Sequence, residues 1–177
     1  MDRNDFIPNM QKFTSISAVG VSALRGQGVG VLKKTQEYLG ELDLSILKDI
    51  NTHEDIISWL DKQTEKILDC MPLMNRPWGA ARKALNLFLR DCLYNKYLCQ
   101  EYKMERLENW LEIPLDSLVA KGLREKAEKG LLPKWPGLKH LKKKISDQYQ
   151  DIAQSFADIN EIARVHMDVA LWLENRR

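Results

Sequence analysis

The chain has 177 residues, of which 44% are hydrophobic and 29% charged, and its formal net charge is +2. This composition is typical of a soluble globular protein, and the length suits one domain or two closely packed lobes. No apolar run approaches the roughly 18 residues that span a membrane, which excludes a membrane helix, and the weak positive charge permits an acidic partner such as nucleic acid without requiring one.

The N-terminal residues and the cysteines predict a reduced, cytoplasmic protein. The stretch MDRNDFIPNM contains two acids and no apolar segment, which does not fit a secretory signal. Cys70, Cys92 and Cys99 lack the spacing of metal ligands and are too few for an iron–sulfur cluster. We therefore expect no metal site and a cytoplasmic location.

The hydrophobic periodicity predicts an all-α fold, without strand patterns or internal repeats. Asn51 and Thr52 form a start signal for one helix, because Glu54 and Asp55 follow in its first turn. Pro77 suits the first turn of another helix. Residues 16–28 are predicted to start as a helix and to end in a glycine-rich turn. About nine helices are predicted in all, the others over residues 29–41, 43–50, 53–71, 78–98, 103–112, 116–128, 146–159 and 161–174.

Helix 78–98 is apolar almost all round, which is typical of a helix enclosed by others. We expect it at the centre of a single helical domain that covers residues 1–177. One lobe would combine residues 1–75 with the C-terminal helices, the other would span 76–145, and a cleft would lie between them.

Three polar residues interrupt this central helix on one face, namely Lys83, Asn86 and Arg90. A buried cation needs a cleft, an anion or a carboxylate partner. In one interpretation the two cations reach the surface or form structural ion pairs. In the other, Lys83 is an active-site lysine, because a nearby cation and partial desolvation both favour the neutral, nucleophilic amine.

The stretch EIPLDSLVAKGL (112–123) places Asp116 after a proline turn and at the start of a helix. Backbone N–H groups and the helix dipole stabilise a carboxylate in that position. Both a simple helix cap and a functional carboxylate are compatible with this placement.

Together, ARKALNLFLRDCLY and EIPLDSLVAKGL resemble the helix-hairpin-helix superfamily of DNA glycosylases, and most closely its archaeal 8-oxoguanine glycosylase branch. The resemblance implies that Lys83 is the catalytic lysine and that Asp116, 33 residues later, is the catalytic aspartate. It places Arg90 at the position of a second cation. HMDVALW matches the motif that holds the extruded base through Asp168 and Trp172, whereas NRPWGAARK replaces the glycine-rich hairpin signature.

Further substrate contacts follow from the same resemblance. Gln27 is the nearest candidate for a base-reading glutamine, and Asn86 shares the face of the catalytic lysine. Trp59 or Trp78 would form a second aromatic wall unless it packs in the core. The DNA backbone would be contacted by Arg76, Arg82, Gly79, Lys142 and Lys143.

The implied activity is removal of an oxidised purine, 8-oxoguanine, with strand cleavage and without a metal or organic cofactor. The expected partner is damaged DNA, as a duplex or a single strand, and the expected state is a monomer. The alternative is an inactive helical module of the same fold that binds nucleic acid or a protein partner.

Overall fold

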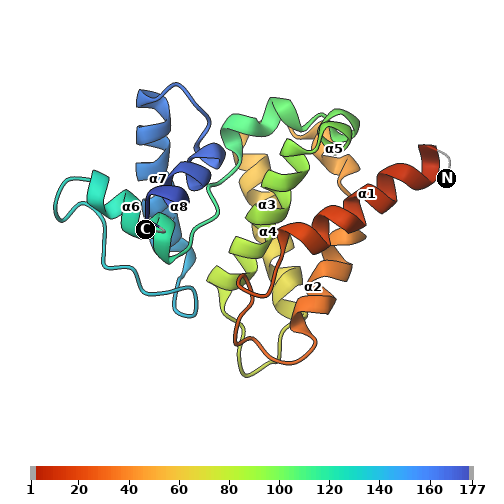
Figure 1. The fold of residues 1–177 in the computed structure, drawn as a ribbon, viewed down its shortest axis with the longest axis horizontal. Coiled ribbons are helices and arrows are strands. Elements are labelled where there is room, and N and C mark those ends of the chain that lie inside the picture. Colours follow the sequence, from red (N-terminus) through yellow and green to blue (C-terminus); the bar gives the residue numbers. More distant parts are fainter. Residues whose placement is uncertain (1–2, 176–177) are drawn as a thin grey trace.

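A computed structural model describes residues 3–175, and this part of the chain is all-α without a strand, which confirms the predicted fold class (Figure 1). Loops and three 3₁₀ segments join its α-helices. The α-helices are α1 (Arg3–Ala18), α2 (Val31–Gly40), α3 (His53–Asp69), α4 (Trp78–Tyr94), α5 (Lys96–Tyr102), α6 (Ser117–Lys126), α7 (Lys143–Ile159) and α8 (Met167–Asn175). The 3₁₀ segments are η1 (Ser45–Asp49), η2 (Met104–Trp110) and η3 (Arg164–His166).

The stretch 16–28 was predicted to start as a helix and end in a glycine-rich turn, but only residues 16–18 are helical and they are the end of a longer helix. Helix α1 ends at Ala18 and contains Pro8, a residue that usually interrupts helices and so conceals this one in the sequence. Residues 19–30 form turns instead, and three of their glycines have φ angles between 78° and 114°. Backbone in that region is open to glycine and strained for other residues, so the glycines favour turns here.

The central helix is shorter than predicted because Asn95 interrupts it. The Asn95 side chain accepts hydrogen bonds from the N–H groups of Tyr97 (3.1 Å) and Leu98 (3.2 Å), so it caps α5 and separates α5 from α4. Lys103, with φ 52°, then ends α5. The helix predicted over 103–112 is the 3₁₀ segment η2.

Two hydrophobic cores divide the chain near residue 112. Buried side chains from 19 to 111 form the first core together with Ala163 and Val165, and buried side chains from 113 to 171 form the second. Figure 1 shows α1 to α5 on one side and α6 to α8 on the other. This division differs from the expected lobes, because α4 packs on α1, α3 and α5 within the first core, whereas the C-terminal helices α7 and α8 belong to the second.

A buried ion network lies at the junction of the cores. Glu112 accepts hydrogen bonds from Arg82 Nε (2.8 Å), Arg82 Nη2 (2.7 Å) and Asn86 Nδ2 (2.8 Å). Arg82 also donates to Thr64 (3.0 Å) and pairs with Asp61 at 3.0 Å. The network joins α3, α4 and the connection between the cores.

Helix α7 and η3 hold the same connection from the other side. Gln150 makes two hydrogen bonds with the backbone of Ile113, accepting from its N–H (3.0 Å) and donating to its carbonyl (2.9 Å). Arg164 Nε donates to the carbonyl of Leu111 (3.0 Å). These contacts fix the backbone that leads into the start of α6.

Candidate active site

A pocket of about 360 Å³ opens between the two lobes. Its walls come from the end of α1, the turn that follows, and helices α4, α6 and α8. Five predicted site residues line it, namely Lys83, Arg90, Asp116, Asp168 and Trp172. The pocket therefore gathers side chains separated by as much as half of the chain.

Lys83 and Asp116 are in direct contact across this pocket. Lys83 Nζ lies 3.2 Å from Asp116 Oδ2, and the lysine is only 9% exposed. The other oxygen, Asp116 Oδ1, accepts hydrogen bonds from the N–H groups of Leu118 (2.9 Å) and Val119 (3.0 Å), so Asp116 caps α6. The two interpretations of Asp116 are thus compatible, because one oxygen caps the helix and the other meets the lysine.

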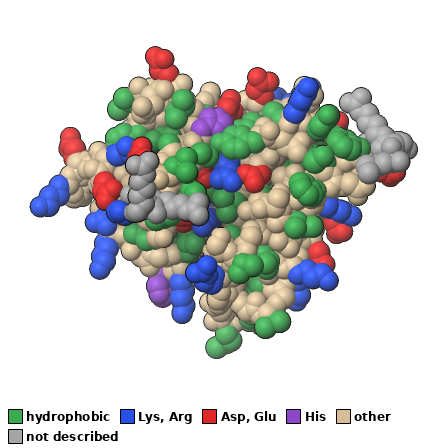
Figure 2. All heavy atoms as spheres, in the orientation of Figure 1, with side chains coloured by type: hydrophobic (Ala, Val, Ile, Leu, Met, Phe, Trp, Pro, Cys, Tyr) green, Lys and Arg blue, Asp and Glu red, His purple; other side chains and the backbone are tan. Residues whose placement is uncertain are grey.

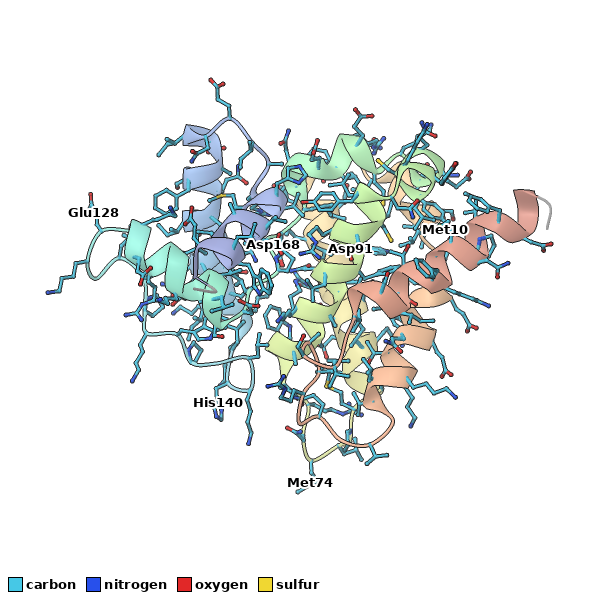
Figure 3. The ribbon with its side chains drawn as sticks, in the orientation of Figure 1. Met10, Met74, Asp91, Glu128, His140 and Asp168 are labelled. Atoms are coloured by element: carbon cyan, nitrogen blue, oxygen red, sulfur yellow. The ribbon has the colours of Figure 1, made fainter. Side chains whose placement is uncertain are left out.

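Arg90 is held by two carboxylates. It donates to Asp91 Oδ1 from Nε (2.9 Å) and Nη2 (2.7 Å), and it pairs with Asp168. In Figure 3, Asp91 and Asp168 lie close together near the middle of the molecule. Burial lowers the pKa of Arg90, but the charges of Asp168 and Asp91 outweigh burial and the net pKa is raised. These counter-charges offset the repulsion on Lys83 that the sequence predicts.

Asp168 lines the pocket, and one of its carboxylate oxygens is buried without a hydrogen-bond partner in the described part of the chain. The residue is 6% exposed, and its Oδ1 atom is buried without a hydrogen bond to any described residue. Burial raises the pKa of this carboxyl, and the charge and hydrogen bond of Arg90 offset the rise only in part. A buried acceptor left unsatisfied costs stability unless a ligand or water supplies a donor. Asp168 therefore keeps hydrogen-bonding capacity that no described residue uses.

We expect Asp168 to titrate above the ordinary aspartate pKa of about 3.9 and Arg90→Gln to raise its pKa further, because burial would then act with less opposition. An NMR titration of the side-chain carboxyl carbon measures both values. A raised carboxyl pKa means that its contribution to stability is present at low pH and is lost as the pH rises through the folded-state pKa. A midpoint at or below that of a model peptide would contradict this expectation.

The polar stripe on α4 divides between two places. Lys83, Leu87 and Arg90 face the pocket, whereas Arg82 and Asn86 point into the network around Glu112. Asn86 is therefore not among the residues that line the pocket. The sequence could not separate these faces, because Asn86 is only three residues from Lys83 and both positions fit one stripe.

Gln27 also lies away from the pocket lining. Its Oε1 atom accepts from Asn75 Nδ2 (3.2 Å), and its Nε2 atom donates to the carbonyl of Arg25 (3.2 Å). The side chain thus ties the turns at 19–30 to the loop at 71–77. Ser22, which the sequence analysis missed because it falls in the wrongly predicted helix, lines the pocket instead.

Two of the predicted DNA-backbone contacts are wrong. Arg82 is buried in its ion network. Gly79 is covered by the turn at 138–141, because a Cβ atom there would lie 2.6 Å from Leu141 Cβ and 2.7 Å from the carbonyl oxygen of Leu138. This turn closes off the start of α4, where a phosphate was expected.

The other predicted backbone contacts differ in exposure. Lys143 Nζ lies 3.2 Å from Asp147 and 3.6 Å from Asp61, so carboxylates already surround it. Arg76 and Lys142 are exposed, and Arg76 makes a weak pair with Asp69 at 3.3 Å.

Of the three candidate aromatic walls, only Trp172 lines the pocket. Trp59 is buried in the first core. Trp78 packs against both cores, and the guanidinium of Arg82 lies 5.4 Å from its ring centroid. His166, the residue before α8, contacts Glu108 and the hydroxyl of Tyr94.

Neither a metal-binding cluster nor a membrane-spanning helix is found among the described residues. Within 3–175, no cluster of three or more His, Cys, Asp or Glu side chains could hold a metal ion. No helix in the same range is long and apolar enough to cross a membrane.

In comparisons with known proteins, no family model, curated protein or solved structure matches the chain.

Proposed function

We propose that the chain is a DNA glycosylase with AP lyase activity, which removes an oxidised purine such as 8-oxoguanine through a Schiff base on Lys83. The observation that carries this proposal is the 3.2 Å contact between Lys83 Nζ and Asp116 Oδ2 in a pocket that also holds Asp168 and Trp172. A base inside a duplex cannot reach such a pocket, so the target nucleotide is flipped out of the stack. The resemblance of the sequence to helix-hairpin-helix glycosylases supports the same reading.

The reaction begins at the sugar. Lys83 Nζ gives a proton to water and then, as a free amine, attacks C1′; the bond between C1′ and the base breaks, and the base leaves with the bonding electrons and takes up the proton that the amine releases. The Asp116 carboxylate stabilises the positive charge that develops on the sugar. Opening of the sugar ring, with a proton passing to O4′, then gives the Schiff base on Lys83.

Strand cleavage follows by β-elimination. Asp116 removes a proton from C2′, and the C3′–O bond breaks with departure of the 3′ phosphate, which cuts the strand on the 3′ side of the lesion. Water then hydrolyses the Schiff base and frees Lys83. Every group that moves a proton or electron pair in this scheme comes from the substrate, water or the Lys83–Asp116 pair.

Base selection would use the opposite wall of the pocket. The carboxylate of Asp168, which lines the pocket, would accept the extra N–H that distinguishes 8-oxoguanine from guanine. Trp172 would stack on the extruded ring, an interaction worth about 1–3 kcal/mol per base. Arg90 would keep Asp168 oriented through their ion pair.

The proposal is tested by incubating the chain with borohydride and a duplex that contains one 8-oxoguanine. Reduction of the Schiff base should give a covalent protein–DNA adduct that survives denaturing electrophoresis. An undamaged duplex of the same sequence serves as the control. Absence of an adduct from the native chain, with lesions of several kinds, would refute the proposed chemistry.

An exposed apolar tip favours a second candidate function, a module that binds a protein partner. Val29 is fully exposed and Met74 is 98% exposed, on two loops that the Gln27–Asn75 hydrogen bond holds together. Figure 3 shows Met74 pointing away from the body of the molecule. Exposed apolar groups that gather in one place are typical of interaction surfaces.

If the tip serves a protein partner, the double variant Val29→Ser/Met74→Ser should keep oligonucleotide affinity and adduct yield within about twofold of the native values. The reason is that surface substitutions away from the bound strand change little. Fluorescence anisotropy and the borohydride assay measure the two quantities. A tenfold loss of oligonucleotide affinity would instead assign the tip to DNA.

A further inference from the structure

Positive charge is concentrated in one segment of the chain. Residues 117–144 contain nine Lys and Arg and two Glu, a net charge of +7 (nine minus two), within a chain of net charge +2. The remaining residues therefore carry a net charge of −5. Figure 2 shows many of the Lys and Arg side chains along the lower left of the molecule, over the lobe that contains α6.

Most of these cations are not neutralised within the protein. Six of them are exposed and form no ion pair with a described residue, namely Arg124, Lys129, Lys134, Lys139, Lys142 and Lys144. Lys121 pairs with Glu125 only at 3.7 Å, with both side chains more than half exposed, and such pairs contribute little. The segment is thus open to polyanions.

A second pocket lies within this cationic surface. It has a volume of about 370 Å³ and is lined by Ser117, Lys121, Arg124, Glu125 and Trp135. An aromatic ring beside two cations is the combination that binds an unpaired base together with its phosphates.

The Trp135 ring is fixed in place from behind. Its centroid lies 5.3 Å from that of Tyr149, with the two planes at 75°, in an edge-to-face contact. Tyr149 is itself fully buried and donates a hydrogen bond to the carbonyl of Pro133 (2.8 Å). A ring held in this way loses little conformational entropy when a base stacks on it.

Helix α6 connects this pocket to the candidate active site. Asp116, which caps α6, and Val119 line the Lys83 pocket, whereas Ser117 and Lys121 line the Trp135 pocket. Because an α-helix is about 10–12 Å wide with its side chains, a strand with one nucleotide in the Lys83 pocket can reach the Trp135 pocket within its next few nucleotides.

We propose that the pocket around Trp135 is a second DNA subsite, in which an unpaired base of the substrate strand stacks on the indole and Lys121 and Arg124 hold the adjacent phosphates. This inference rests on the proposed function in taking DNA as the ligand. It adds that the strand beside the lesion is bound unpaired, so the protein binds a single strand or a locally opened duplex in preference to a continuous one.

The test measures binding of a short fluorescein-labelled oligothymidylate, without a lesion, by fluorescence anisotropy at several salt concentrations. Trp135→Leu should weaken binding roughly tenfold, in line with the loss of one stacked base. Lys121→Gln/Arg124→Gln should reduce the slope of log K against log salt by about 1.4, at about 0.7 per phosphate contact on single strands. Lys33→Gln/Lys34→Gln, which removes two exposed charges from α2, is the matched control and should leave binding unchanged.

Native-like affinity in the Trp135→Leu variant would overturn the inference. Should that variant fail to fold by circular dichroism, the salt slope of Lys121→Gln/Arg124→Gln decides, because both side chains are exposed and their loss does not disturb the core. The lesion-free probe measures binding without turnover, so the two proposals can fail separately. If the native chain forms the borohydride adduct but Trp135→Leu binds the oligothymidylate normally, only the subsite proposal is refuted. If the native chain forms no adduct but Trp135→Leu weakens binding of the oligothymidylate, only the proposed glycosylase chemistry is refuted.

Discussion

Lys83→Gln should abolish the borohydride-trapped adduct and lower base release by roughly a thousandfold or more, as expected when a covalent nucleophile is removed. Glutamine is close to lysine in length and can still donate a hydrogen bond to Asp116, so the buried contact at 3.2 Å has a neutral replacement. The loss would therefore come from the missing amine rather than from an unpaired carboxylate. Denaturing electrophoresis of the reduced complex measures the adduct, and single-turnover assays measure base release.

Asp116→Asn separates the two roles of the carboxylate. Asparagine is as good a helix cap as aspartate, so α6 should stay in place. The charge that stabilises the sugar cation is lost, and base release should fall by about a hundredfold to a thousandfold. Lys33→Gln, on the exposed face of α2, is the control and should release base at the native rate.

The Lys83→Gln prediction has its own contradicting outcome. If that variant still formed as much adduct as the native chain, the nucleophile would be a side chain other than Lys83.

Glu112→Gln should lower the free energy of unfolding by about 3–5 kcal/mol, the usual cost of removing one partner from a buried ion pair. Glu112 is 3% exposed and accepts three hydrogen bonds, two of them from Arg82. Without its charge, Arg82 would retain only Asp61 as a counter-ion. Urea unfolding followed by circular dichroism measures the change.

The exposed pair between Lys33 and Glu37, at 3.7 Å, supplies the matched control. Glu37→Gln removes a carboxylate of the same kind, and it should change the free energy of unfolding by at most about 0.5 kcal/mol. Equal effects of Glu112→Gln and Glu37→Gln would contradict the structural role of the buried network.

The same network makes stability depend on pH in a defined direction. Burial alone raises the pKa of Glu112, but the charge of Arg82 and hydrogen bonds from Arg82 and Asn86 outweigh burial, and the net pKa is lowered. A lowered carboxyl pKa contributes stability above the unfolded-state value of about 4.3, and this contribution is lost as the pH falls through the folded-state pKa. The native chain should therefore lose stability more steeply in this acid range than Glu112→Gln does.

Local signals were enough to place the central pair of the site. A helix period put Lys83 on a definite face of α4, and a proline turn put Asp116 at a helix cap. Their contact also requires the chain between them to fold back on α4. No local pattern predicts that approach, and it was expected only from the resemblance to a family. The position of Asp168 and Trp172 opposite this pair rested on the same resemblance.

The errors have physical causes that lie outside local patterns. Arg82 was expected on the surface, but three side chains distant in sequence, those of Asp61, Thr64 and Glu112, compensate its burial. Gly79 was expected to meet a phosphate, but a turn some sixty residues later covers it. Residues 16–28 were expected to start as a helix before their glycine-rich turn, whereas the helix lies earlier in the chain and the turns already begin at residue 19.

The amine and the carboxylate at the heart of the pocket belong to different cores, Lys83 to the one built around α4 and Asp116 to the one built around α6. Their 3.2 Å separation consequently lasts only while the halves remain docked through the clamped connection at 110–113. Warming or dilute denaturant that loosens this docking should abolish the proposed glycosylase activity before the helical circular dichroism signal changes. Activity would then be lost at a lower temperature or denaturant concentration than the helices, and the difference between the two midpoints would measure how stable the docking of the two halves is.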